Sequence, residues 1–235
     1  GVLPSNALLI IVAHATVTPA SPILASLTIF AGGTCRLAAK CFVIHWKVRY
    51  RWTEQSMNRK DHWEQVYQTK APEDVSWFQA RPEISLRLIE ANISNRADGV
   101  IDVGGGASVL VDFLVTDGFK QLAVLDISAA ALEHARQRLG KRAVEIAWFE
   151  ADVTQFNPPH RFCLWHDRAV FHFLTNETDR RKYVETLNRT LTPEGHVIIA
   201  TFAKDGPLKC SGLGVCRYDA ATICAELGPR FKLIE

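Results

Sequence analysis

Three consecutive glycines, Gly104–Gly106, stand between the apolar run 100–103 and the segment 109–114, which has the composition of a helix start. Because glycine has no Cβ, such a turn lets the backbone approach a ligand closely, and the free N–H groups of the following helix can bind polar atoms. The pattern is typical of a nucleotide-type binding loop. The G-x-G-x-x-G spacing of a dinucleotide site is incomplete because position 109 is Val, so a tight turn without a ligand stays open as an alternative.

Four acidic residues lie at or near the ends of predicted strands: Asp102, Asp126, Asp152 and Asp167. In a parallel sheet the carboxyl ends of the strands meet at one edge, which is where open α/β sheets bind ligands. One acid at a strand end is ordinary. Four acids that converge on one edge are better explained by a polar ligand.

Strands and helices alternate along most of the chain. The strands are expected at 100–103, 120–126, 144–150, 161–167, 196–202 and 231–234. Helical patterns lie at 60–67, 82–89, 128–139, 176–191 and 219–228, where Asn176 or Thr178 could open the fourth and Ser128 and Asp219 cap the third and fifth. Helices of this length between strands imply right-handed crossovers. We therefore predict an α/β fold with a doubly wound, mostly parallel sheet.

The composition fits one globular domain with an extension. Of the 235 residues, 48% are hydrophobic and 22% are charged, and the net charge is +2. Residues 1–56 hold five basic residues and one acid, so residues 57–235 are mildly acidic and no nucleic-acid partner is expected. The six cysteines form no C-x-x-C pair, which indicates no structural zinc site and a reducing, cytoplasmic location.

Residues 1–56 differ in character from the rest. The first 35 residues contain no charged side chain, but prolines interrupt the apolar segment 7–31, which makes it a poor membrane span. Membrane contact or anchoring is expected only if residues 7–31 insert. The only methionine is Met57, where ordinary globular sequence begins. The hypothesis is that 1–56 is a non-native or weakly ordered extension and 57–235 is the domain.

The chain resembles the class I S-adenosylmethionine-dependent methyltransferases across residues 58–235. The stretch 100–108 is similar to the first motif of that family, with Ser108 where a third glycine is usual. Asp126 matches the acid at the end of the second strand, and 152–153 matches the segment beside the adenine ring. Residues 191–199 resemble the family's turn and fifth strand, L-x-P-x-G followed by an apolar run, which dehydrogenases do not share.

The resemblance implies S-adenosyl-L-methionine as cofactor and a Rossmann-like sheet. It implies cofactor contacts by Trp63, Asp102, Gly104, Gly105, Gly106, Ser108, Asp126, Ile127, Asp152, Val153 and Asp167. Arg168 and His172 follow the fourth strand, where the family places substrate-facing residues, and Asp167 or His172 could act as a base. Trp63 could instead only pack its helix on the sheet, and His172 could be a structural histidine.

Methyl transfer from a sulfonium is an in-line displacement, so the protein mainly aligns donor and acceptor and excludes water. The acceptor is a small molecule or a protein side chain. A non-catalytic module that binds the cofactor, or an NAD-dependent oxidoreductase, stays open as an alternative function.

The class I sheet usually has a seventh, antiparallel strand between the fifth and sixth. This sequence stops at 231–235, within the expected sixth strand. We therefore expect a C-terminally truncated domain with unpaired backbone groups beside strand 196–202.

Overall fold

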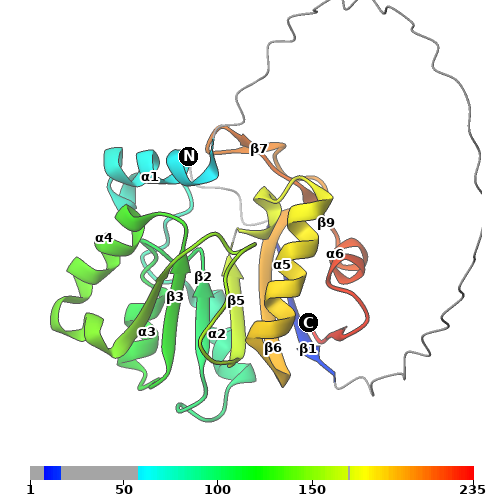
Figure 1. Cartoon of the computed structure of the whole chain (residues 1–235), viewed down its shortest axis with the longest axis horizontal. Coiled ribbons are helices and arrows are strands. Elements are labelled where there is room, and N and C mark those ends of the chain that lie inside the picture. The colour runs from blue at the N-terminus through cyan, green and yellow to red at the C-terminus, as the bar shows by residue number, and fades with distance from the viewer. Residues whose placement is uncertain (1–7, 17–57, 169) are drawn as a thin grey trace, which may run out of the picture. The chain divides into compact units, whose positions relative to one another are not determined.

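The computed structural model describes residues 8–16, 58–168 and 170–235. Figure 1 shows a central sheet with helices on both faces. The helices are α1 (Arg59–Thr69), α2 (Glu83–Asn92), α3 (Leu110–Thr116), α4 (Ala129–Leu139), α5 (Glu177–Thr190) and α6 (Ala220–Leu227), with short 3-10 turns η2 (Pro72–Asp74), η3 (Gly140–Glu145) and η4 (Phe171–Phe173). The strands are β1 (Leu8–Ala15), β2 (Val100–Val103), β3 (Leu122–Asp126), β4 (Ile146–Glu150), β5 (Phe162–Arg168), β6 (Leu191–Ala203), β7 (Lys209–Cys210), β8 (Leu213–Gly214), β9 (Arg217–Tyr218) and β10 (Phe231–Leu233).

The main sheet has the strand order β10-β1-β6-β5-β2-β3-β4, and β9 pairs with β6 off this path. The pairs β6–β5, β5–β2, β2–β3 and β3–β4 are parallel. The chain reverses its winding direction at β2, so the carboxyl ends of β2 and its neighbour β5 form the switch point where open sheets bind ligands. The predicted doubly wound, mostly parallel α/β fold is confirmed.

Strand β1 corrects two of the sequence-based expectations. It pairs antiparallel with β6 from Leu8 to His14 and with β10 from Ala13 to Ala15. The backbone of β6 is therefore paired on this side, and the expected unpaired edge is wrong. The expectation that residues 1–56 lie outside the fold is also wrong for Leu8–Ala15, because this apolar segment is long enough to pair with two strands. The rest of that segment, 17–56, lies outside the described residues.

The membrane expectation for 7–31 falls partly on the same strand. Residues 8–15 are strand rather than helix, and 17–31 lie outside the described residues. Across the described ranges, no helix combines the length and the apolar character that crossing a bilayer requires.

Two apolar clusters hold the helices on the two faces of the sheet. Helices α5 and α6 pack on one face, where Tyr183, Leu187 and Ile223 are fully buried. Helices α2, α3 and α4 pack on the other face, with Leu88 and Leu132 among the buried residues. Neighbouring residues of β1 divide between these clusters, as the period of two along a strand requires.

Local sequence signals fix the ends of several helices. The Ser128 side chain accepts a hydrogen bond from Ala131 N at the start of α4, and Gly140 ends that helix with φ +55°. Asn176 caps α5, which decides between the two starts that the sequence allows. Asp219 caps α6 in a reciprocal arrangement with Thr222.

Candidate functional site

The glycine turn after β2 is built so that side chains do not fit. Gly104 has φ +70°, and its N–H donates to Leu125 O at 2.7 Å. A Cβ on Gly105 would collide with the Asp102 carboxylate, and one on Gly106 would lie 2.5 Å from both Ala131 Cβ and Asp126 Oδ2. The turn thus packs closely between β3 and α4 while its backbone borders a cavity.

Asp126 ends β3 with a carboxylate fixed by two backbone donors. Oδ2 accepts from Gly106 N at 3.0 Å, and Oδ1 accepts from Ser128 N at 2.9 Å. Burial raises the pKa of Asp126 to about 6, and the two backbone hydrogen bonds oppose this shift. Each oxygen keeps a lone pair, so the carboxylate can accept two further hydrogen bonds from a ligand.

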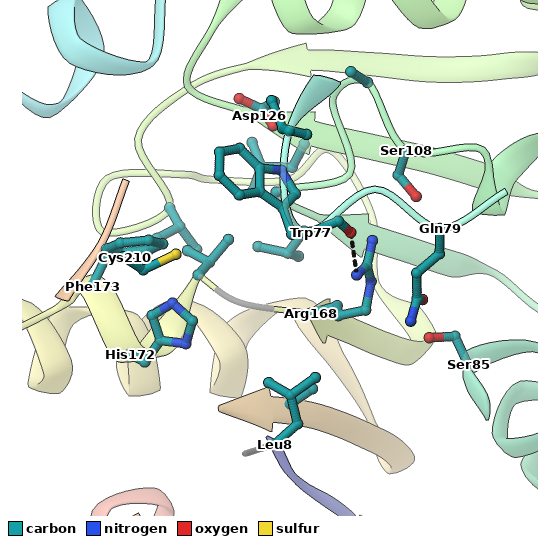
Figure 2. A pocket seen from close by; sticks show the side chains of 18 of the residues that line it. Leu8, Trp77, Gln79, Ser85, Ser108, Asp126, Arg168, His172, Phe173 and Cys210 are labelled. Atoms are coloured by element: carbon teal, nitrogen blue, oxygen red, sulfur yellow. Dashed lines mark hydrogen bonds between the residues drawn. The ribbon is translucent and has the colours of Figure 1, made fainter. Parts of the chain in front are cut away.

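A cavity of about 620 Å³ runs along the carboxyl edge of the sheet. Figure 2 shows its wall from Asp126 and Ser108 to His172 and Leu8. It includes most of the residues predicted to bind the cofactor or substrate: Trp63, Gly104, Ser108, Asp126, Ile127, Asp152, Val153, Arg168 and His172. The structure thus brings these side chains from five different segments to one hollow.

Four predicted residues lie outside the lining of this cavity, and three of them are Asp102, Gly105 and Gly106. Asp102 is buried, and its Oδ1 lies 2.7 Å from His166 Nδ1. His166 Nε2 in turn lies 2.9 Å from Ser85 Oγ, so the carboxylate is linked to α2. The geometry gives Asp102 a positioning role beneath the glycine turn.

Asp167 also lies outside the cavity lining, with 0% exposure. Its carboxylate accepts from Val170 N at 2.7 Å, Phe171 N at 3.1 Å and the Tyr183 hydroxyl at 2.6 Å. Burial raises the pKa of Asp167 to about 6. With three protein donors and no access to the cavity, this side chain holds the turn after β5 rather than facing a ligand.

Aromatic side chains from the N-terminal side of the domain line the cavity. Trp63 of α1 packs edge to face against Trp77 and Phe173, at centroid distances of 5.8 and 5.0 Å. Trp77 Nε1 donates to the Tyr67 hydroxyl at 3.2 Å. Burial raises the pKa of Tyr67, and the nearby charge of Asp126 raises it further. Sequence reasoning missed Tyr67 and Trp77 as lining residues, although the aromatic pair Trp77-Phe78 is a signal for the second of them.

An ion-pair bridge holds the start of α1 to the segment after β4. Arg59 Nη2 lies 3.2 Å from Asp152 Oδ2 and 3.1 Å from Asp179 Oδ2. The other oxygen of Asp152 accepts from the N–H and the hydroxyl of Thr154. Asp152 therefore lines the cavity as part of a fixed turn.

Arg168 and His172 line the cavity at the end of β5 and in the turn that follows it. Arg168 Nη1 donates to Trp77 O at 3.0 Å (Figure 2). His172 is buried with 0% exposure, its ring stacks on Phe202, and neither ring nitrogen has a hydrogen-bond partner among the described residues. Burial lowers the pKa of His172 to about 3, so the imidazole is neutral near pH 7.

The chain is similar in sequence to known methyltransferases. Residues 100–195 match the family described as "Methyltransferase domain". The chain is 24% identical over 161 residues to the eEF1A lysine and N-terminal methyltransferase of Danio rerio, covering 67% of this chain and 23% of that protein. It is 31% identical over 144 residues to a ubiquinone/menaquinone biosynthesis C-methyltransferase of Coxiella burnetii, covering 57% of this chain and 53% of that protein.

The chain thus spans about a quarter of the first relative and about half of the second. A solved structure from work on the conversion of a disulfide bond into a thioacetal group during echinomycin biosynthesis has the same fold. It superposes with a TM-score of 0.50 at 21% identity, over 60% of this chain and 59% of that one.

Proposed function

We propose that this chain is a class I S-adenosylmethionine-dependent methyltransferase, which transfers the methyl group of that cofactor to a small molecule or a protein side chain. One observation carries the proposal. The Asp126 carboxylate, fixed by Gly106 N–H, faces a cavity within the segment that matches the methyltransferase family.

The residues present fit this cofactor at one end of the cavity. Gly104 of the glycine turn lines the cavity without a Cβ, so its backbone can approach the methionine part. Asp126 has free acceptor capacity for two ribose hydroxyls, a mode of binding in which no phosphate charge has to be compensated. Ile127 and Val153 supply apolar surface for the adenine ring.

When bound, the cofactor supplies a methyl group on a sulfonium, whose departure leaves a neutral sulfide. The chain must therefore align the acceptor and exclude water, as the aromatic cover of Trp63, Trp77 and Phe173 allows. Neither of the two predicted bases is suited to that role, because Asp167 does not reach the cavity and neutral His172 takes up a proton poorly. The site suits a nucleophile that His172 orients through a hydrogen bond.

Calorimetric titration of the full chain with S-adenosylhomocysteine, and with NAD in parallel, tests the proposal. We expect binding of S-adenosylhomocysteine alone. Asp126→Ala should abolish it, whereas Asp117→Ala, at an exposed position after α3, should leave it unchanged. Binding of NAD instead, or no effect of Asp126→Ala, would contradict the proposal. If the cofactor binds but no methyl acceptor is turned over, the chain is a non-catalytic binding module.

A further inference from the structure

The cavity continues past the predicted cofactor end into a second half between α2 and strands β5, β6 and β1. Residues paired across these strands present their side chains to one face: Arg168 pairs with Ala200, and Ala200 pairs with Ile10. Figure 2 shows Arg168, Gln79 and Ser85 together at one side of this half, with Leu8 on another wall. The Arg168 guanidinium therefore lies beside the mainly aliphatic second half of the cavity.

The cation of Arg168 has no acidic partner in the part of the chain that the structure describes. Its one hydrogen bond goes to the neutral backbone oxygen of Trp77 and uses one of its five donors. The charge of Asp102 acts on it, but that carboxylate lies against His166 Nδ1 at 2.7 Å. Burial lowers the pKa of Arg168, because removal of the guanidinium from water disfavours its charged form.

The two other arginines in the cavity lining have acidic partners, and Arg59 is paired with Asp152 and Asp179. Arg87 of α2 lies 3.5 Å from the Glu235 carboxylate, and its side chain is 62% exposed. Solvent water and the Glu235 carboxylate therefore compensate the charge of the Arg87 guanidinium. Only Arg168 combines partial burial with a missing counter-ion among the described arginines of this cavity.

The walls around Arg168 are apolar and come from elements far apart in the sequence. Leu8 and Ile10 of β1, Ile84 and Leu88 of α2, and Phe202 of β6 line this half. Ile84 is 51% exposed and belongs to this lining, so the apolar wall reaches the protein surface. A ligand that fits here has an apolar body and one charged end.

We propose that Arg168 recognises a carboxylate or similar oxyanion on an apolar methyl acceptor, with Gln79 as a neighbouring donor. This inference rests on the proposed function, because it assigns the second half of the cavity to the acceptor. A bidentate guanidinium–carboxylate pair would supply the missing counter-charge and orient the acceptor relative to the cofactor end. The aliphatic walls, including β1, would take up the rest of the molecule.

The test measures binding of octanoate and 3-phenylpropanoate, with the matched neutral amides octanamide and 3-phenylpropanamide, to the full chain saturated with S-adenosylhomocysteine. We expect each carboxylate to bind at least about tenfold more tightly than its amide. Arg168→Gln should remove this preference, and Arg168→Lys should keep part of it because the charge remains. Arg87→Gln, which changes the exposed arginine of the same cavity, should leave the preference within about twofold of wild type.

The outcomes separate this inference from the proposed function. Unchanged S-adenosylhomocysteine affinity with equal binding of acid and amide would overturn the role of Arg168 and leave the proposed function standing. A preference that disappears equally in Arg87→Gln would also overturn it, because general electrostatic attraction would then explain the result. Carboxylate preference without any S-adenosylhomocysteine binding would support the anion site and contradict the methyltransferase assignment.

Discussion

Asp126 Oδ2 accepts a hydrogen bond from the backbone N–H of Gly106 at 3.0 Å, so the glycine turn and the acid at the end of β3 form one unit. The N–H that could otherwise face a ligand is used to fix the carboxylate. A second bond, from Ser128 N, fixes the other oxygen. The orientation of the proposed ribose-binding group therefore depends on the backbone position of Gly106.

Gly106→Ala should weaken cofactor binding at least about tenfold. The new Cβ would lie 2.5 Å from Ala131 Cβ, and because Ala131 belongs to α4 the turn rather than the helix must move. Calorimetry with S-adenosylhomocysteine measures the loss. Gly214→Ala is the matched control, because a Cβ there meets nothing within 4 Å. Equal affinities for the two variants would show that the turn does not position Asp126.

Cofactor affinity should fall as the pH drops through about 6. Burial raises the pKa of Asp126 to about 6, so the free protein takes up a proton on this carboxyl below that pH. The protonated form has lost acceptor capacity for the ribose hydroxyls, and ligand binding must then displace the proton. Titration with S-adenosylhomocysteine between pH 5 and 7.5 should show this slope in wild type and a flat profile in Asp126→Asn. A slope shared by both proteins would assign the titration to another group.

The sequence predicted the parts of the site that depend on local chemistry. The glycine turn, the acid after β3 and the caps at Ser128 and Asp219 follow from φ restrictions and hydrogen-bonding groups within a few residues, and the structure confirms them. It also places Asp126 and Asp152 in the same cavity. The end of a strand can be located from its apolar run, and the carboxyl ends of parallel strands meet at one edge of the sheet. The convergence of Asp126 and Asp152 at that edge was therefore predictable.

What the sequence did not predict depends on contacts between distant segments. Asp102 and Asp167 are acids at strand ends like Asp126, but their partners are His166 and Tyr183, far along the chain. Local pattern does not show which acid finds such a partner. The position of β1 between β6 and β10 also depends on contacts between distant segments. An apolar run indicates that a segment is buried, but it does not indicate which strands the segment pairs with.

Ile11→Ala should lower the free energy of unfolding by about 2–5 kcal/mol. Ile11 is 2% exposed in β1 and belongs to the cluster under α5 and α6, so its truncation leaves a cavity in the core. Leu233→Ala, in neighbouring β10, removes a side chain that is 45% exposed and should change stability by well under half as much. Urea unfolding of both variants measures the difference. Small, equal losses would mean that β1 does not occupy the sheet in solution.

Asp167→Asn should destabilise the fold by about 1–3 kcal/mol and leave cofactor affinity nearly unchanged. The Asp167 carboxylate accepts from Val170 N, Phe171 N and the Tyr183 hydroxyl, and an asparagine amide would turn an N–H₂ group toward at least one of these donors. The cost falls on the turn after β5, because Asp167 does not line the cavity. Thermal unfolding and S-adenosylhomocysteine titration of the same sample separate the two effects.

Tyr183→Phe provides the complementary test. It removes one donor to Asp167 and also the acceptor of Trp165 Nε1, 2.8 Å away, so it should lower the melting temperature as Asp167→Asn does. Both variants should retain methyl transfer once an acceptor is known, since neither side chain reaches the cavity. If Asp167→Asn instead abolished transfer at unchanged melting temperature and cofactor affinity, while Tyr183→Phe retained it, Asp167 would be the base that the sequence first suggested. The buried hydrogen bonds would then describe a resting arrangement that opens during turnover.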